Sequence, residues 1–501
     1  MPPALARTVH DQGAAPRPYA APARSWWGPD APGSTQLMVL LFAVCAAAAA
    51  AFAPQMLWDG DTLWHLTAGD WMWAHHQVTR VDTFSYTALG RPWINLEWLS
   101  EVIMAPVHAA GGWSGLQLFF ALALGALTWI LGSEISRKLP PFSCAVALFL
   151  ILACTTQSWL ARPHILALPI LALWTVQLLR AREAGRSPPL WLLPVMTVWA
   201  NLHGSFLFGL ALIGPFALEA LVDSAATDRM KTIRAWGLFG VLALLASLIT
   251  PHGVDGIVYP IKLMTMRTLP DIVEWQSSNF SHLSSFETSL LAVLFILLYR
   301  GVKIPVFRLI TVLGLLYLTL HETRHQMVLA VTGGLLLVQP IGEAMAGSDP
   351  IVRLPKLAPA VRYGVLAAIL VVVAGVSAIR FAVPATLTDG PTAPITALAH
   401  VPPALRQQPM LNEYGVGGYL IYNHMPPFID GRADMYGDDF IETFLKAKTD
   451  PVRMQALIAR YGMRWSILAT NNPGVGVIDA LPGWKRIYAD KWNVVQVKTG
   501  S

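Results

Sequence analysis

Two aspartates and a histidine stand close together in the segment 58–67. Asp59 and Asp61 are two residues apart, and His65 follows four residues after Asp61. The segment comes directly after an apolar run, residues 37–54, so it lies within a turn or two of a membrane surface. Ionisable groups at such a place are costly unless they face a water-filled cavity or take part in chemistry.

Two kinds of chemistry fit this pair of carboxylates. Asp59 or Asp61 could act as general base on an acceptor hydroxyl, or both could hold a divalent cation such as Mg²⁺ or Mn²⁺. The structural alternative is that Asp59 caps the next helix while Asp61 is solvated, since aspartate is common at that position of a helix. The spacing leaves open which aspartate would be the base.

A second set of polar residues lies in later connections between apolar runs. An arginine fork can bond two phosphate oxygens at once, and a histidine can add a further donor. We therefore expect these residues, together with His65, to bind a lipid phosphate at the membrane interface. The alternative is that single members snorkel to the interface or bond to carbonyls in the core. The set consists of Arg162, His164, His203, Arg324 and His325.

The elements that must position these residues are transmembrane helices. The chain has 501 residues, of which 54% are hydrophobic and 13% charged, and its mean hydropathy is +0.50. So low a charge is unusual for a soluble domain, and a membrane-spanning helix needs roughly 20 apolar residues. The sequence predicts a mainly α-helical, polytopic bundle of about eleven spans. The expected spans are 37–54, 115–132, 142–158, 165–180, 189–200, 204–222, 234–250, 287–299, 305–320, 326–340 and 361–382.

Basic residues predict the orientation of these spans, because short loops rich in Lys and Arg stay in the cytoplasm. Every second connection is basic, which predicts an inner N-terminus and an outer C-terminus. Residues 1–35 should form a disordered cytoplasmic tail, and 36–382 the transmembrane module. The basic connections contain Arg137 and Lys138; Arg180, Arg182 and Arg186; Arg229, Lys231 and Arg234; Arg300, Lys303 and Arg308; and Arg353, Lys356 and Arg362.

The first outer connection, residues 55–114, is long and rich in tryptophan. It predicts amphipathic segments lying at the interface, with Trp71, Trp73, Trp93 and Trp98 in an aromatic belt. After residue 383 the apolar runs shorten and charges return, so residues 383–501 should form a small extracytoplasmic α/β domain. We expect strands at 465–469 and 494–497, and a helix over 440–461.

The sequence also argues against several other kinds of site. Cys45, Cys144 and Cys154 all lie in apolar runs, so neither a disulfide nor a cysteine metal site is expected. There is no Walker loop, no dinucleotide-binding glycine motif after a strand and no H-E-x-x-H zinc motif. We expect membrane lipids as surroundings and no nucleic acid as partner.

The segment from Asp59 to His65 resembles the first-loop acidic motif of the GT-C superfamily of membrane glycosyltransferases. It is similar in form to the D-x-D-x-x-x-H motif of oligosaccharyltransferase catalytic subunits. The resemblance implies that Asp59 or Asp61 supplies the catalytic carboxylate and that the donor is a sugar on a polyprenyl phosphate or diphosphate. The predicted layout of helices, first loop and C-terminal outer domain is also similar.

Two motifs of the C-terminal domain bear on this resemblance. The run Asn412-Glu413-Tyr414-Gly415 is similar to the D-Y-G part of the oligosaccharyltransferase W-W-D-Y-G motif. However, the two tryptophans are missing and the acid is Glu413, so a strand followed by a glycine turn is the better interpretation. The dense polar run Asp430–Asp434 could border an acceptor cleft or form a salt-bridged turn.

From these features the sequence predicts an inverting membrane glycosyltransferase. It would move a sugar from a polyprenyl-phosphate-linked donor to a glycan, lipid or protein acceptor at the outer face of the bacterial cytoplasmic membrane. Asp59 or Asp61 would deprotonate the acceptor hydroxyl, and Arg162 and Arg324 would stabilise the departing phosphate. One alternative is a polysaccharide polymerase or ligase that uses lipid-diphosphate donors. The other is a non-catalytic membrane transporter or scaffold.

Overall fold

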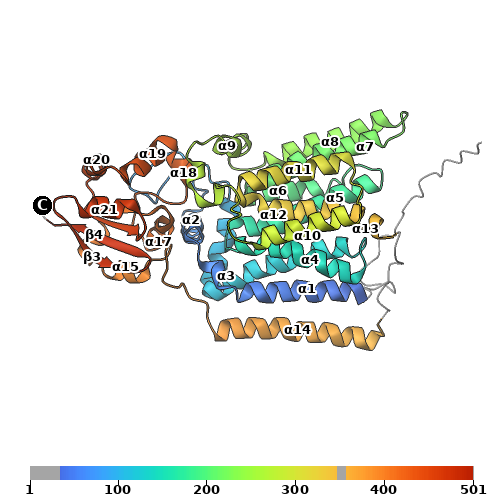
Figure 1. Ribbon diagram of the computed structural model, residues 1–501, viewed down its shortest axis with the longest axis horizontal. Coiled ribbons are helices and arrows are strands. Elements are labelled where there is room, and N and C mark those ends of the chain that lie inside the picture. Colours follow the sequence, from blue (N-terminus) through green and yellow to red (C-terminus); the bar gives the residue numbers. More distant parts are fainter. Residues whose placement is uncertain (1–33, 347–356, 500–501) are drawn as a thin grey trace, which may run out of the picture.

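The computed structural model describes residues 34–346 and 357–499. The predicted tail 1–35 falls almost wholly outside this part of the chain, as do Arg353 and Lys356. The described chain forms a helical bundle with a smaller domain, which contains a sheet, at one end (Figure 1).

Each of the predicted spans corresponds to an apolar helix or continuous helical run in the described residues. Seven are long and apolar enough to cross a membrane, and four more are shorter. The protein is therefore an integral membrane protein. The long runs are α1 (Ser34–Ala51), α3 (Trp98–Ile135), α4 (Pro141–Thr155), α5 (Pro163–Glu183), α8 (Arg229–Ser247), a run of α12 (Gln326–Val328) and α13 (Gly334–Ala346), and α14 (Pro359–Ala382). The shorter ones are α6 (Leu192–Leu202), α7 (Phe206–Val222), α10 (Ser285–Tyr299) and α11 (Val306–His321).

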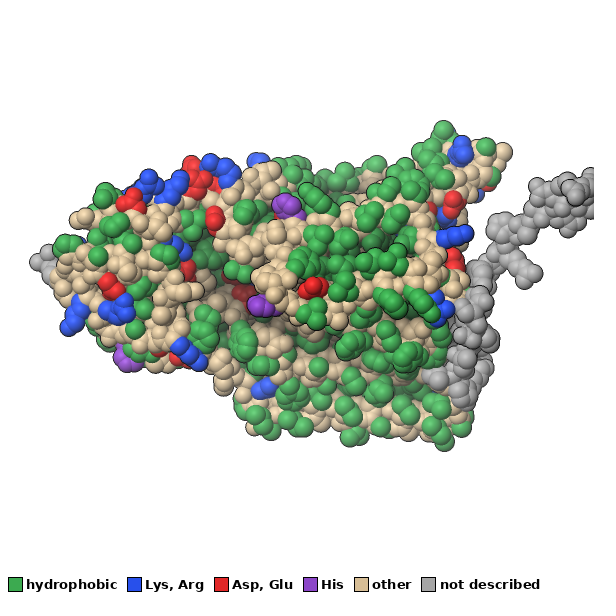
Figure 2. Space-filling view, in the orientation of Figure 1, with side chains coloured by type: hydrophobic (Ala, Val, Ile, Leu, Met, Phe, Trp, Pro, Cys, Tyr) green, Lys and Arg blue, Asp and Glu red, His purple; other side chains and the backbone are tan. Residues whose placement is uncertain are grey.

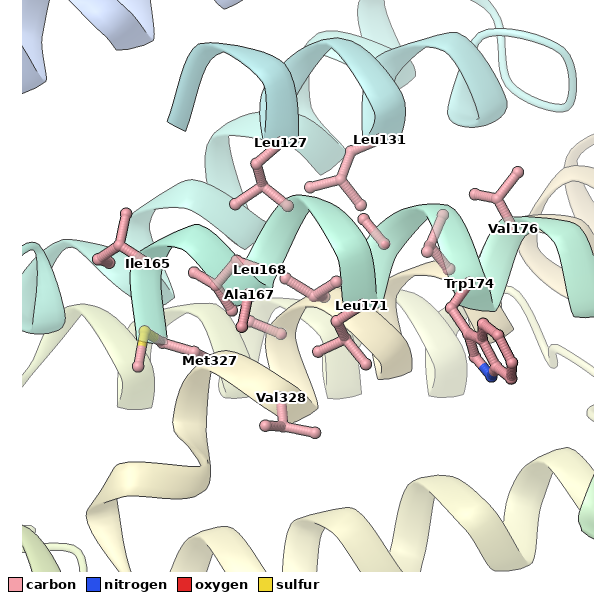
Figure 3. Close-up of a cluster of buried hydrophobic side chains, with 14 of the residues drawn as sticks. Leu127, Leu131, Ile165, Ala167, Leu168, Leu171, Trp174, Val176, Met327 and Val328 are labelled. Atoms are coloured by element: carbon pink, nitrogen blue, oxygen red, sulfur yellow. The ribbon is translucent and has the colours of Figure 1, made fainter. Parts of the chain in front are cut away.

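The centre of the bundle is the packing of α3 and α5. Figure 3 shows Leu127 and Leu131 of α3 pointing toward α5, and both side chains are buried in one cluster with Leu168 and Leu171 of α5. In lipid, such contacts stabilise the bundle through close van der Waals packing, because the lipid tails are as apolar as leucine itself. Apolar side chains cover much of the outer surface of the bundle, whereas charged side chains gather over the C-terminal domain and the opposite end (Figure 2).

The predicted first loop is largely helical. A short 3₁₀ turn, Pro54–Leu57, leads into α2 (Gly60–His75). The membrane helix α3 begins at Trp98, well before the expected span, and breaks at Gly112, whose φ of 57° and ψ of −154° are not helical. Trp93, expected in the interfacial belt, is only 4% exposed, because it packs against the C-terminal domain.

The C-terminal domain has a four-stranded mixed sheet in the order β1-β2-β4-β3. Strand β1 is parallel to β2, whereas β2–β4 and β4–β3 are antiparallel. The sequence predicts β2 and β4 and, before the glycine turn at Gly415, also β1, whereas β3 is an addition to them. The strands are β1 (Met410–Asn412), β2 (Trp465–Ala469), β3 (Trp484–Ala489) and β4 (Asn493–Lys498).

Helices surround this sheet. The expected helix over 440–461 is two helices, because Asp450 caps the second by accepting hydrogen bonds from the backbone N–H groups of Val452 and Arg453. The helices of the C-terminal domain are α15 (Ile395–Ala399), α16 (Pro403–Arg406), α17 (Gly417–Tyr422), α18 (Ala433–Tyr436), α19 (Asp438–Ala447), α20 (Pro451–Tyr461) and α21 (Pro473–Asp479). One further short helix, α9 (Asp255–Leu263), lies in the connection between α8 and α10.

The C-terminal domain packs closely on α2. Trp64 and Trp93 belong to the same buried cluster as Phe428 of the domain. At the start of α2 the two backbones touch. A Cβ atom on Gly60 would collide with the Gly415 carbonyl, and one on Gly418 with the Gly60 carbonyl. The acidic motif therefore lies where the bundle and the C-terminal domain meet.

Candidate active site

The two aspartates of the motif have different local roles. Asp59 is the N-cap of α2, and its Oδ1 accepts a hydrogen bond from the Asp61 backbone N–H at 2.8 Å. Asp61 is in the first turn of the helix, where its Oδ1 accepts a hydrogen bond from the Trp64 indole N–H at 3.0 Å. The expected capping role of Asp59 is therefore present, whereas Asp61 makes specific contacts beyond solvation.

Arg162 lies in front of both aspartates. It is the N-cap residue of α5. Its guanidinium Nη1 is 3.2 Å from Asp59 Oδ2, and its Nη2 is 3.0 Å from Asp61 Oδ2. A third carboxylate, that of Glu274, lies 3.1 Å from Nη1. The structure thus brings Arg162 to the motif, as expected, but in this structure its partners are three carboxylates.

Burial and charge oppose each other in this cluster. Burial raises the pKa of Asp61 to about 7, even though the nearby Arg162 charge lowers it. Burial would also raise the pKa of Glu274, but Arg162 and Arg324 outweigh it and lower that pKa to about 2. Asp61 is therefore poised to exchange a proton near neutral pH, which suits a general base.

His65 and His203 turn toward a glutamate instead of toward open space. His65 is fully buried, with Nδ1 at 2.8 Å from Glu101 Oε1 and Nε2 at 3.4 Å from Glu97 Oε2. His203 Nε2 is 3.2 Å from Glu97 Oε1. These two predicted site residues therefore hold Glu97, whose side chain is 25% exposed.

His164 and His325 bond to backbone carbonyls, in agreement with the structural alternative. His164 Nε2 lies 2.9 Å from the Ser158 carbonyl, and His325 Nδ1 lies 3.4 Å from the Leu318 carbonyl. The ring of His164 still lies beside that of His203, with centroids 6.4 Å apart. His164 therefore lies beside the histidine that contacts Glu97, whereas His325 makes local contacts, since its Nδ1 is also 3.4 Å from Glu322 Oε2.

Arg324 approaches the site on the face of a tryptophan. Its guanidinium carbon is 3.9 Å from the centroid of the Trp275 ring, a distance at which a cation is attracted to the ring. The Thr323 backbone N–H donates to the Gln276 carbonyl at 3.0 Å, which fixes the two connections to each other. Glu274, which contacts Arg162, directly precedes Trp275, which contacts Arg324. This connection therefore brings the two arginines close to each other.

The C-terminal domain supplies one wall of the site. A Cβ atom on Gly431 would overlap Oδ1 of Asp61, so only glycine allows this approach. On either side of Gly431, Arg432 forms a buried ion pair with Asp430 at 2.7 Å and another with Asp82 at 2.7 Å. The run Asp430–Asp434 is therefore salt-bridged, as one of the two expectations has it, and at Gly431 it contacts the acidic motif.

The carboxylates do not form a cation site around an open space. Asp59, Asp61 and Glu274 surround the guanidinium of Arg162, which already supplies the positive charge. Within the described residues, no group of three or more His, Cys, Asp or Glu side chains is arranged to hold a metal ion. The residues therefore do not fit Mg²⁺ or Mn²⁺ in this arrangement, and we derive no step through a metal.

Several residues of this site do not stand out in the sequence. Glu97, Glu274 and Trp275 are there only polar or aromatic members of the outer connections, and Gly431 is only part of a polar run. Their position in the connections that the sequence predicts to be outer is the available signal. What singles them out is contact with Asp61, Arg162, Arg324 or the two histidines His65 and His203, which come from segments far apart in the chain.

Comparison with solved structures identifies the fold. The chain aligns with ArnT from Cupriavidus metallidurans bound to undecaprenyl phosphate, with a TM-score of 0.51 and 14% identity over 93% of this chain and 98% of that one. It also aligns with the archaeal oligosaccharyltransferase AglB from Archaeoglobus fulgidus in complex with an inhibitory peptide and a dolichol-phosphate. That TM-score is 0.51, with 10% identity over 87% of this chain and 69% of the other. The chain has a GT-C fold.

A further oligosaccharyltransferase structure from the same archaeon, tethered to an acceptor peptide with an NVT sequon, has a TM-score of 0.52 at 10% identity. It covers 95% of this chain and 75% of the other. No protein-family model and no curated protein matches the sequence. The predicted GT-C resemblance is confirmed at the level of fold, with the acidic motif at the junction of bundle and C-terminal domain.

Proposed function

We propose that this GT-C protein is an inverting glycosyltransferase that takes its sugar from a polyprenyl-phosphate-linked donor. The observation that carries the proposal is the cluster of Asp61, Asp59 and Arg162 at the membrane end of α2, with Arg324 beside it. A base and a phosphate-binding cation are the two groups that such a transfer needs. The similar folds that hold dolichol-phosphate and undecaprenyl phosphate support a lipid-linked donor.

The transfer is a single displacement. The acceptor oxygen attacks the anomeric carbon while the bond from that carbon to the phosphate oxygen breaks, and the electron pair leaves with the phosphate. Asp61 takes the acceptor proton, because its pKa is near neutral whereas Asp59 is committed to capping α2. Arg324 binds the departing phosphate, since its contact in the described residues is an aromatic face and not a carboxylate.

Arg162 has a double role in this proposal. In the free enzyme its guanidinium pairs with Asp59, Asp61 and Glu274. When the donor phosphate arrives, its guanidinium can share one N–H edge with the phosphate and keep the other on the carboxylates. The sugar would then lie between the arginines and Asp61, with Gly431 of the C-terminal domain on the acceptor side.

The site and the C-terminal domain are proposed to lie outside the cytoplasm of a bacterium. In the described residues, the basic connections after α3, α5 and α10 lie at the opposite end of the bundle from the acidic motif (Figures 1 and 2). A reporter fused after Ser501 should be active only outside the cytoplasm. A reporter active only inside would reverse every assignment of sides.

Cells that lack the protein test the function before either the sugar or the acceptor has been identified. We expect them to accumulate one polyprenyl-phosphate-linked sugar and to lose one glycan modification of the cell envelope. Wild-type protein should restore both, and Asp61→Asn should restore neither. Unchanged lipid-linked intermediates and unchanged glycans would contradict the proposal.

A further inference from the structure

Glu97 is a carboxyl that the proposed mechanism leaves unused, although it borders the same site. Its Oε1 faces His203 Nε2 at 3.2 Å, and its Oε2 faces His65 Nε2 at 3.4 Å. The His203 Nδ1 atom accepts a hydrogen bond from the Ser205 backbone N–H at 3.1 Å. The proton of neutral His203 is therefore on Nε2, the nitrogen that faces Glu97 Oε1.

His65 connects Glu97 to a second, fully buried carboxyl. Its Nδ1 is 2.8 Å from Glu101 Oε1, and Asn95 donates its amide N–H to Glu101 Oε2. Its Nε2 has no hydrogen-bond partner in the described part of the chain although it is buried, and it points at Glu97. An imidazole between two carboxyls can accept a proton at one nitrogen and release one at the other.

Proton counting makes this group a store for one exchangeable proton. If Glu97 and Glu101 were both ionised, the neutral His65 ring would lie between two carboxylates. The ring has only one N–H group, so the lone pair of its other nitrogen would face a negatively charged oxygen. One additional proton removes that conflict, whether it is on Glu97, on the ring or on Glu101. The buried position of the ring keeps it from becoming a stable imidazolium, since burial lowers the pKa of His65 well below its ordinary value.

The groups around Glu97 favour its neutral form at the edge of the site. Burial raises its pKa to about 7, against the charges of Arg162 and Arg324 and together with those of Asp61 and Asp434. His65 on α2 and His203 after α6 contact Glu97. The charges that act on it are those of Asp61 on α2, Glu101 on α3, Arg162 before α5, Arg324 after α11 and Asp434 on α18. The arginines that act on Glu97 are the ones assigned to the donor phosphate.

We propose that Glu97 is a second catalytic carboxyl, which donates a proton to the departing lipid phosphate, and that His65, Glu101 and His203 position it and hold its proton in reserve. The inference rests on the proposed function. As the bond between the anomeric carbon and phosphate oxygen breaks, the phosphate gains negative charge and takes the Glu97 proton. The acceptor proton passes to Asp61, so each transfer leaves Glu97 ionised and Asp61 neutral, and exchange with water restores both. A phosphate monoester with a second pKa of about 6 is a fitting acceptor for such a proton.

The pH dependence of transfer by the purified, full-length protein tests this role. Asp61 must be ionised and Glu97 protonated, so the wild-type rate should rise and then fall with pH. Glu97→Gln keeps the shape and a donor N–H group but has no proton to transfer. We expect it to lower the rate by about 10²-fold or more, to abolish the fall at alkaline pH, and to leave binding of undecaprenyl phosphate unchanged.

Further variants separate this inference from the proposed function and from misfolding. Glu183→Gln, at the opposite end of the bundle, is the matched control and should retain the wild-type profile. His65→Gln should shift the alkaline fall to another pH. In the infrared difference spectrum between acid and alkaline pH, Glu97→Gln should lack one protonated-carboxyl band. A Glu97→Gln profile that superposes on wild type, or an unchanged set of bands, would overturn the inference, even if Asp61→Asn is inactive and the proposed function stands.

Discussion

Arg162 and Asp61 form an ion pair of 3.0 Å between two segments that lie about a hundred residues apart in the chain. The arginine comes from the start of α5 and the aspartate from the first turn of α2. The pair places a cation where the donor phosphate is proposed to bind and keeps the base engaged in an ion pair until then. The geometry thereby links donor binding to release of the base.

The first prediction concerns the ionisation of Asp61. A general base works only when ionised, so on the acid side of the profile transfer should rise as pH approaches about 7, the pKa to which burial raises Asp61, before the fall expected from Glu97. The Arg162 charge lowers that pKa, so Arg162→Gln should move the rise to higher pH. The measurement is the initial transfer rate against pH for both proteins. A rise at the same pH in the variant would show that Arg162 does not act on the base.

The same raised pKa also affects stability, with a definite sign. The folded protein binds a proton at Asp61 more tightly than the unfolded chain does. The contribution of this group to folding stability is therefore greatest below the ordinary aspartate pKa and is lost as pH rises toward 7. Asp61→Asn removes this dependence. The midpoint temperature of thermal unfolding should therefore depend less on pH in the variant than in wild type, between the ordinary aspartate pKa and pH 7.

The second prediction concerns Arg324, which stacks on Trp275. Lysine keeps the charge but has no planar fork to bond two phosphate oxygens or to lie flat on the ring. Charge-assisted hydrogen bonds are worth roughly 1.5–3 kcal/mol each, so Arg324→Lys should weaken binding of undecaprenyl phosphate by about one to two powers of ten. Arg324→Ala should be weaker still. Wild-type affinity of the lysine variant would mean that Arg324 only anchors the helix end among headgroups.

The third prediction concerns Gly431. An added Cβ atom would overlap Asp61 Oδ1, so Gly431→Ala should displace the base and reduce transfer strongly while the protein stays folded. Gly476→Ala is the matched control, because it lies in the same domain, on α21, and its added methyl group meets nothing within 4 Å. Equal transfer rates for the two variants would show that contact with the C-terminal domain does not position Asp61.

The membrane spans could be predicted from the sequence because each is a local property. A run of apolar residues must be helical in lipid, and every predicted run is matched by a helix in the described residues. The motif was also visible, since Asp59, Asp61 and His65 lie within two turns of α2. Their function as a set could be inferred only from the resemblance to a known family.

The contacts that complete the site could not be predicted, because they join distant segments. Nothing in the sequence around Arg162 says that its partners are Asp59, Asp61 and Glu274. Trp93 looked like an interfacial residue because tryptophan is common there. It is buried instead, since the Arg432 guanidinium lies 4.8 Å from its ring and the C-terminal domain covers it. The sequence around Gly431 does not show that this glycine contacts Asp61, because the contact is visible only when the positions of both segments are known.

The fourth prediction concerns metal dependence. Arg162 occupies the space among the three carboxylates, so transfer should persist in the presence of a chelator and gain nothing from added Mg²⁺ or Mn²⁺. The measurement is the transfer rate of purified protein before and after chelation. Loss of activity that only a divalent cation restores would mean that Arg162 leaves the carboxylates and that they hold an ion during the reaction.

The most direct test of the account is transfer by purified protein in lipid vesicles, with a polyprenyl-phosphate-linked sugar and the acceptor identified from cells that lack the protein. Wild type should produce glycosylated acceptor with inverted anomeric configuration and free lipid phosphate. Asp61→Asn should bind the lipid phosphate at least as tightly as wild type does but transfer about 10²–10⁴ times more slowly, the range expected for loss of a general base. Near-normal transfer by Asp61→Asn would contradict the claim that this carboxylate is the catalytic base.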